Sequence, residues 1–410
     1  MDSLANRLKG LGFKPASSVQ ATEPIGRISL EEAIQGAVVE NSVGSFVIKE
    51  QLYPYDHIHG DVIFSDGIST GSISKTARIE PSNNALDRML FIDTETSGLS
   101  GGAGTFAFLI GVGRFVREGF LLRQFIMRDP TEEQSMLLHL SNVIDKNTIF
   151  VTFNGKSFDI PLIQYRFIIN RFPDRIRELP HLDILHLSRR LWRRQLASCT
   201  LKDLEVAILH FTRTSEDVPG WMIPDIYFEY LRTNDPKQIA DVIYHNAQDI
   251  VSLAALFIQI SELMQADTIG KEYSIDDLIA IGRIYWDMRD YETAGRIYQA
   301  CSEKKLNNTQ IIAVNSALGQ YQKYCQDYVK AVEHWKTAAA IGDMASCVEL
   351  AMYYEHKIRD VASALQWSEL GLSFIAGNKN TQNQSRYQKV LEKRIARLKK
   401  KGSKNVQETD

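Results

Sequence analysis

An apolar run that ends in two acidic residues, RMLFIDTE at positions 88–95, limits the folds open to this chain. The apolar residues predict a buried strand, and side chains two positions apart on a strand share a face, so Asp93 and Glu95 would lie side by side. Neighbouring carboxylates repel each other unless a cation lies between them, and Mg²⁺ and Mn²⁺ prefer oxygen ligands. The motif predicts a metal site at a strand end, with a strand-capping role for Asp93 as the alternative.

The segments around this run predict the class of fold. Two β-rich runs follow at 105–116 and 119–129, and a helical stretch at 131–145 leads to a fourth strand in TIFVTFNG. The chain from there to residue 262 has mostly helical spacing. The order β-β-β-α-β followed by helices predicts an α/β fold with a mixed sheet flanked by helices.

Composition excludes several classes of protein. The 410 residues are 44% hydrophobic and 24% charged, which is typical of soluble globular chains. The net charge of −3 gives no general attraction for nucleic acid, so any such surface must be a local basic patch. We find no CxxC pair, no signal-peptide pattern and no run of eighteen apolar residues. The sequence therefore predicts a reduced, cytoplasmic protein without a membrane partner.

From about residue 272 the pattern becomes entirely helical. Asp290, Asp327 and Asp360 recur at offsets of 37 and 33 residues, and an alanine follows each of them four positions later. Small residues at fixed places let helix pairs pack closely, and periods in the mid-thirties are typical of tetratricopeptide-like hairpins. A generic helical bundle is the alternative. A lysine- and arginine-rich tail ends the chain, either as a solubilising helix end or as a surface that attracts phosphates.

Two more acidic residues join the strand motif. Asp159 follows an Asn-Gly turn and precedes an apolar helical run, where either helix capping or metal binding accounts for it. Asp249 lies on an apolar helix, and burying its carboxylate would be costly without a metal or a basic partner. His245 precedes Asp249 by about one helical turn and shares its face.

These residues form a pattern that suits a two-metal phosphodiesterase. Such an enzyme holds two ions about 3.5–4 Å apart with carboxylates, and the ions clamp the attacking water and the leaving oxygen. A histidine beside them can take the proton from the water. The sequence thus predicts two divalent ions, Mg²⁺ or Mn²⁺, held by Asp93, Glu95, Asp159 and Asp249, with His245 as the base.

The segments FIDTETSGLSGGAGTFAFLIGVG, FVTFNGKSFDIPLI, HLDILHLSRRLWRR with CTLKDLE, and YHNAQDI resemble the YprB-type branch of the DEDD (DnaQ-like) exonuclease superfamily. They span about residues 88–262. The resemblance implies that Asp93 and Glu95 match the first exonuclease motif, Asp159 the second and Asp249 the third.

The residue that positions the water in this superfamily is a tyrosine four residues before the last aspartate, or a histidine five residues before it. Here His245 has the tyrosine spacing and Tyr244 the histidine spacing, so the pattern is crossed. His245 and the following asparagine fit the YprB-type pattern, which favours His245. The same resemblance includes Asp183, which we expect to be structural.

The resemblance implies a ribonuclease H-like fold and 3′→5′ exonuclease activity on DNA or RNA with a single-stranded 3′ end. We therefore expect an N-terminal extension at 1–85, the exonuclease domain at 86–265, helical repeats that offer a surface for a protein partner at 272–380 and the basic tail at 381–410. A weakly active or inactive nucleic-acid-binding module, with the repeats as a scaffold, is the alternative function.

Substrate contacts are predicted from residues near these motifs. Arginines can pair with phosphates and a tryptophan can stack on a base, although a charge run on a helix is often just a solvated face. The predicted contacts are Thr94, Asn154, Arg190, Trp192 and Arg194.

Overall fold

The computed structural model describes residues 28–80, 85–98, 104–173, 175–213, 217–265, 273–376 and 382–407. Its main sheet is mixed and has seven strands in the order β1-β2-β7-β6-β5-β8-β9. β8 pairs in parallel with β5 and β9, and all other pairs are antiparallel. The strands are β1 (Ala37–Asn41), β2 (Gly44–Pro54), β5 (Met89–Thr96), β6 (Ala107–Val116), β7 (Gly119–Ile126), β8 (Ile149–Thr152) and β9 (His181–Asp183).

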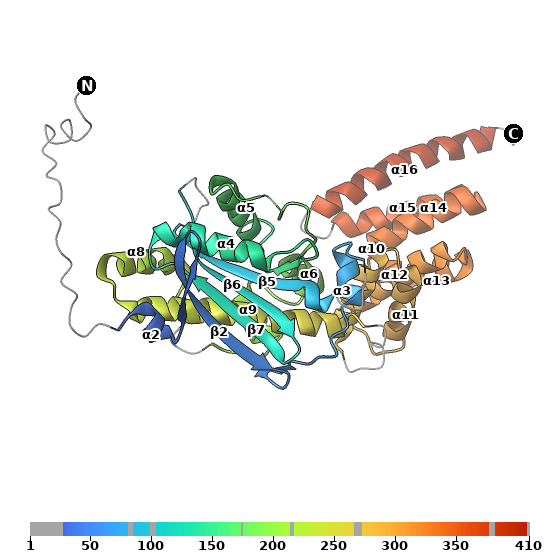
Figure 1. The fold of residues 1–410 in the computed structure, drawn as a ribbon. Coiled ribbons are helices and arrows are strands. Elements are labelled where there is room, and N and C mark those ends of the chain that lie inside the picture. Colours follow the sequence, from blue (N-terminus) through green and yellow to red (C-terminus); the bar gives the residue numbers. More distant parts are fainter. Residues whose placement is uncertain are drawn as a thin grey trace, which may run out of the picture.

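Helices flank this sheet, and a helix-rich region follows it, so the predicted class of fold is confirmed (Figure 1). The long helix α9 lies along the sheet and contacts β5, β6 and β7. α9 spans Pro236–Leu263. The α-helices described before it are α2 (Leu30–Ile34), α3 (Gly71–Thr76), α4 (Glu133–Val143), α5 (Asp159–Ile169), α6 (Ile184–Trp192), α7 (Leu201–Ala207) and α8 (Ile223–Thr233). A short hairpin, β3 (Ile58–His59) with β4 (Val62–Ile63), packs against α9.

Alternation along β5 decides where its acidic residues point. Phe91 belongs to the hydrophobic core on the α9 side, whereas Leu90 and Ile92 belong to the core that includes α4 and α5. Asp93 and Glu95 continue the Phe91 face because side chains alternate along a strand. Both acids therefore face α9.

The close approach of α9 to the sheet depends on glycine. A Cβ atom on Gly111 of β6 would lie 2.3 Å from Asn246 Oδ1 and 2.2 Å from Ile250 Cδ1, both on α9. Only a residue without a side chain leaves room for this helix face. The helix consequently carries its own polar residues to within hydrogen-bonding distance of β5.

Part of the predicted N-terminal extension belongs to the sheet. β2 pairs with β7 from Val47 to Pro54, and β1 forms the sheet edge beyond it. Residues 37–54 are thus integral to the same sheet as β5, and not a separate arm. Residues 1–27 lie outside the described residues.

The C-terminal region is built from consecutive helix pairs at one end of the sheet (Figure 1). In each pair the repeated aspartate caps the second helix, because its carboxylate accepts a hydrogen bond from the backbone three residues later. The residue before each aspartate has a positive φ, at Arg289, Gln326 and Arg359. The helices are α10 (Ile275–Asp287), α11 (Tyr291–Ser302), α12 (Asn308–Tyr324), α13 (Tyr328–Ala340), α14 (Met344–Tyr353) and α15 (Val361–Ala376).

The basic tail forms a helix, α16 (Gln382–Gln407), that packs on α15. A π-helical turn, Tyr354–Ile358, presents the side chain of Glu355 to it. Arg394, Arg397 and Lys401 of α16 all bind the Glu355 carboxylate, at 2.6, 2.6 and 3.2 Å. Within the described residues no helix is long and apolar enough to cross a membrane.

Candidate metal centre

Four carboxylates from three elements converge near the C-terminal end of the interior strand β5, and we call them the sheet-edge cluster. Asp93 and Glu95 come from β5, Asp159 is the first residue of α5, and Asp249 lies in the middle of α9. Burial and the negative charges of the other three acids raise the pKa of Asp93 well above its usual value. Burial, Asp249 and Asp159 do the same for Glu95, although Arg213 opposes them. The acids repel one another, which is the electrostatic state of a site that attracts cations.

Each of the three aspartates is held through one of its two carboxylate oxygens. Asn246 Nδ2 donates to Asp93 Oδ2 at 2.9 Å, and the guanidinium of Arg213 binds Asp249 Oδ1. The backbone and hydroxyl of Thr94 donate to Asp159 Oδ1 at 3.0 and 2.6 Å. Within the described part of the chain, no hydrogen bond from another side chain reaches the second oxygen of these aspartates. One oxygen of each carboxylate is therefore oriented and still available.

Thr94 thus acts on Asp159, whereas we predicted a substrate contact for it. Burial raises the pKa of Asp159 to about 6, and the hydrogen bonds from Thr94 limit the rise. A hydrogen bond from the backbone N–H of Asp159 itself, the first residue of α5, also lowers its pKa. The carboxylate thus interacts with the N-terminus of α5 as well as with Thr94, and local helix capping remains compatible with metal binding at this residue.

His245 lies beside these acids with its ring fixed by a residue that we did not predict. Its Nδ1 lies 2.6 Å from Asp217 Oδ1. On the other side of the ring, Nε2 is 3.5 Å from Asp249 Oδ2 and 3.9 Å from Glu95 Oε1. Tyr244, the competing residue, lies near Tyr53 of β2, whose pKa is raised to about 12 by burial and by the charge of Tyr244. The structure brings His245, and not Tyr244, to the acids.

Arg213 is the positive charge within this group. It binds Glu205 at 2.5 Å and Asp217 at 3.2 Å, besides Asp249, and its side chain is only 5% exposed. Burial lowers the pKa of Arg213, but the hydrogen bond that Arg213 donates to Glu205 and the charges of Asp249 and Glu205 outweigh it, and the pKa is raised. The guanidinium therefore stays charged and fixes Asp249 and Asp217 relative to each other.

The β3–β4 hairpin positions the loop that carries Arg213. The backbone of Asp61 donates to Leu209 O at 2.8 Å, and the ring of His59 stacks on Phe211 with centroids 3.9 Å apart. These contacts hold the chain on both sides of residue 210. Residues 58–63 thereby contribute to the geometry of a site whose Arg213 lies about 150 residues later in the sequence.

Sequence reasoning missed Asp217, Arg213 and Glu205. Asp217 and Arg213 lie in an irregular stretch between α7 and α8, where no periodic pattern marks buried positions. Glu205 had a weak signal, because an acid at a core-facing position of the helical run TLKDLEVAIL requires a partner. Its side chain is 1% exposed, and Arg213 is that partner.

Three of the predicted substrate contacts, Arg190, Trp192 and Arg194, lie in or just after α6 and face the helix pairs. Trp192 is 2% exposed, and its Nε1 donates to Asp277 of α10 at 3.1 Å, so the ring has no face on which a base could stack. The stacking role is therefore wrong. The signal was present in the sequence, since Trp192 shares a helical stripe with Leu185 and Ser188, both buried.

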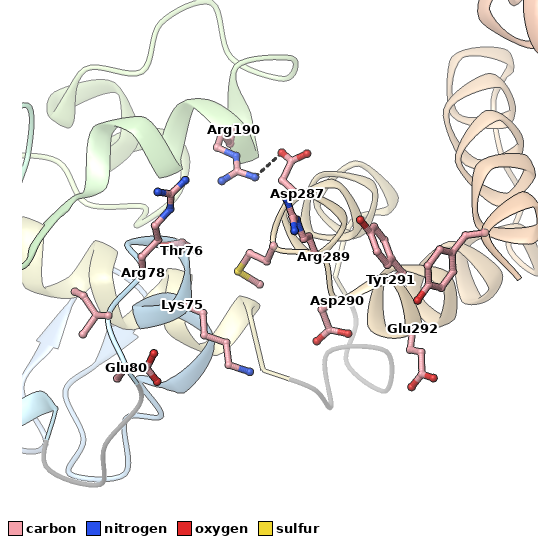
Figure 2. Close-up of a pocket in the computed structure, with 13 residues that line it drawn as sticks. Lys75, Thr76, Arg78, Glu80, Arg190, Asp287, Arg289, Asp290, Tyr291 and Glu292 are labelled. Atoms are coloured by element: carbon pink, nitrogen blue, oxygen red, sulfur yellow. Dashed lines mark hydrogen bonds and ion pairs between the residues drawn. The ribbon is translucent and has the colours of Figure 1, made fainter.

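The two arginines lie at the junction between the sheet and the helix pairs. Arg190 pairs with Asp287 of α10 at 2.7 Å, at the rim of a cavity of about 1080 Å³ that also contacts Arg289 and Tyr291 (Figure 2). Arg194 is exposed and lines a second cavity with Trp286 and Tyr298.

The remaining predicted contact, Asn154, lies in the turn after β8. This residue has a positive φ of 68°, and its backbone donates to Asp183 Oδ1 at 2.8 Å. Asp183 also accepts from the backbone of Lys156 and caps α6 through Leu185. Asp183 is therefore structural, as we expected, and it shapes the turn that leads into Asp159.

The residues present fit a divalent ion. Glu95, His245 and Asp249 each offer one ligand atom, and these atoms lie within 4.8 Å of one another. A cavity of about 320 Å³ opens beside His245 and Asp249 and is also lined by Lys202, Asp217 and Gly220. The oriented free oxygens, the mutual repulsion and the access from solvent are the properties that a metal site requires.

Comparison with known proteins identifies the class first. Residues 90–261 match the family model RNase_H_2, described as the RNase_H superfamily. This segment contains the four converging carboxylates and His245. The match indicates a nuclease-like domain at these residues, and the nucleases of this superfamily generally use divalent metal ions.

A full-length relative then identifies the family. The chain is 30% identical over 371 residues to YprB of Bacillus subtilis (strain 168), described as an uncharacterized protein, and the alignment covers 87% of this chain and 86% of that protein. The chain belongs to the same family as YprB. Among solved structures, the family B DNA polymerase from the hyperthermophilic archaeon Pyrobaculum calidifontis aligns over 69% of this chain and 34% of its own, with 11% identity and a TM-score of 0.32.

Proposed function

We propose that this protein is a metal-dependent 3′→5′ exonuclease of the DEDD type, which hydrolyses phosphodiester bonds with two divalent ions, Mg²⁺ or Mn²⁺. The observation that carries the proposal is the convergence of Asp93, Glu95, Asp159 and Asp249, each of the aspartates with one oxygen anchored and one available. The 3′→5′ direction is carried over from the DEDD resemblance.

In this proposal the four carboxylates hold the ions, which supply Lewis-acid stabilisation of the phosphate and the leaving oxygen. Thr94, Asn246 and Arg213 keep three of the carboxylates from rotating. The role predicted for His245, as the acceptor of the proton from water, stays a prediction. Nε2 is the atom that would accept it, because Nδ1 is bound to Asp217.

A labelled oligonucleotide tests the activity. With a 5′ label and Mn²⁺, the wild-type protein should produce a ladder of products shortened from the 3′ end. Asp93→Asn should slow this by at least about 100-fold, a typical loss for one electrostatic group at a transition state. Glu229→Gln, on the exposed surface of α8, is the matched control and should match the wild type.

Two further substrates define the direction and the class of cleavage. A 3′-terminal phosphorothioate linkage should block degradation, and a circular single strand should remain intact. Cleavage of the circle would show an endonuclease instead. Equal rates for the wild type and Asp93→Asn would leave the alternative, a nucleic-acid-binding module with the helix pairs as a scaffold.

The remaining sequence-based assignments stay proposals. We assign the exonuclease domain to residues 86–265, now with 37–54 as part of its sheet, and tetratricopeptide-like repeats to 272–380. The repeated capping aspartates and the positive φ before each of them support one recurring helix-pair geometry. A protein partner on these helix pairs and a cytoplasmic location are the corresponding expectations.

A further inference from the structure

The imidazole of His245 is oriented in the way that proteins orient a metal-binding histidine. A carboxylate oxygen accepts hydrogen bonds, and Asp217 Oδ1 lies 2.6 Å from His245 Nδ1 and 3.2 Å from Arg213 Nη1. Arg213 Nη1 also lies 3.3 Å from Nδ1, but the carboxylate oxygen is much closer, so the Nδ1 proton is placed between His245 and Asp217. In the neutral ring the lone pair is then on Nε2. A carboxylate behind the ring is the usual support of a ligating histidine.

The lone pair of Nε2 faces two other ligand atoms. Asp249 Oδ2 lies 3.5 Å away and Glu95 Oε1 3.9 Å away. Two ligands of one ion at about 2.1 Å lie roughly 3.0–3.4 Å apart for octahedral or tetrahedral geometry. A contraction of about half an ångström would bring Nε2 to those separations from both carboxylate oxygens. Proton transfer from water requires no such convergence of the histidine with two carboxylates.

One oxygen of Asp249 is already committed. Arg213 binds Oδ1, so the oxygen that faces His245 is the one left for an ion. Arg213 also binds Asp217, and so fixes both the ligand carboxylate and the carboxylate behind the ring. Arg213 is accordingly a positioning residue for this group of ligands.

We propose that Glu95, His245 and Asp249 form a nitrogen-containing site for a divalent transition-metal ion, with His245 as a direct ligand through Nε2. Imidazole binds first-row transition-metal ions, Mn²⁺ more weakly than Fe²⁺, Co²⁺ or Zn²⁺, whereas Mg²⁺ strongly selects oxygen ligands. The site therefore prefers Mn²⁺ to Mg²⁺. This inference rests on the metal-holding part of the proposed function and assigns His245 a role other than that of base.

Pulsed electron paramagnetic resonance tests the ligand directly. In the full-length protein loaded with Mn²⁺ and without nucleic acid, the echo modulation should show coupling to a directly bound ¹⁴N nucleus. The coupling should disappear in His245→Gln and persist in His186→Gln, a control at an exposed histidine of α6. Absence of ¹⁴N coupling in the wild type, with Mn²⁺ bound, would overturn the proposal and support the role of His245 as base.

Competition between ions gives a second readout. Mg²⁺ should displace Mn²⁺ from the wild type only at high excess, and His245→Glu, with three carboxylates, should reduce the preference for Mn²⁺ by about tenfold or more. An unchanged preference in that variant would contradict the proposal. Both measurements are made without a substrate. A protein that shows ¹⁴N coupling but degrades no oligonucleotide would retain this metal site and lose the proposed exonuclease function.

Discussion

Two clusters of buried charge in this protein have opposite composition. At the sheet edge, four carboxylates share one nearby arginine, and the pKa values of Asp93 and Glu95 are raised. At the C-terminal end, a single carboxylate, Glu355, is surrounded by three basic side chains from α16. Burial alone would raise the pKa of Glu355, but the hydrogen bonds and charges of those side chains lower it.

The difference separates a site that needs external cations from one that is complete. The Glu355 carboxylate is fully paired within its own chain, and these ion pairs fasten α16 to the preceding helices. The sheet-edge cluster keeps an excess of negative charge because its carboxylates come from β5, α5 and α9, which pack together for reasons of hydrophobic burial. Excess charge of one sign in a partly buried site is typical of functional sites.

The largest effect on stability should come from breaking the Glu355 cluster. We expect Glu355→Gln to destabilise the protein by roughly 3 kcal/mol, because Arg394, whose side chain is 10% exposed, loses its partner. Urea unfolding of the full chain measures this. Glu229→Gln breaks an exposed pair with Arg232 and should cost about 0.5 kcal/mol or less. Similar losses in the two variants would remove the distinction between the clusters.

Removing a carboxylate from the sheet-edge cluster should raise the free energy of unfolding of the metal-free protein. In the presence of a chelator, Asp93→Asn should stabilise the protein by about 1 kcal/mol, since it removes one repelling charge and keeps an acceptor for Asn246. Adding Mn²⁺ should reverse the order, because the wild type then binds the ion more tightly. Melting temperatures with and without Mn²⁺ measure both effects. A metal-free variant less stable than the wild type would contradict the repulsion.

The smallest and most diagnostic effect is on pH dependence. The folded-state pKa of Asp159 is raised to about 6, so its contribution to metal-free stability is present at low pH and is lost as the pH rises through about 6. The pKa of Glu355 is lowered, so its contribution is present above the unfolded value and is lost as the pH falls through the folded one.

Mn²⁺ binding should consequently weaken below pH 6, by up to about tenfold per unit for each proton displaced. Calorimetric titration at pH 7.5 and 5.5 measures this change. Asp159→Asn is the informative variant, because it should bind Mn²⁺ weakly at both values. Equal Mn²⁺ affinity of the wild type at the two pH values would show that Asp159 does not titrate in this range.

Much of the fold followed from local patterns. The strand at 88–95, the helix at Asp249 and the recurrent aspartates were visible because hydrophobic periodicity and capping are properties of neighbouring residues. The helix of Trp192 was also correctly expected, but its buried face was not. The local sequence, a tryptophan among arginines, looks the same whether the tryptophan is exposed or buried. Trp192 is buried because α10 packs against α6.

The sequence by itself indicated three of the carboxylates, since strand alternation places Asp93 beside Glu95 and an acid on an apolar helix, Asp249, requires a counter-charge, whereas Asp159 depended on the family resemblance. Only the tertiary structure decided which oxygens are free, that His245 and not Tyr244 meets them, and that Asp217 and Arg213 arrive from a loop without pattern. Local spacing fixes which face of an element a side chain takes. The contacts made across that face depend on elements far away in the chain, which no local spacing records.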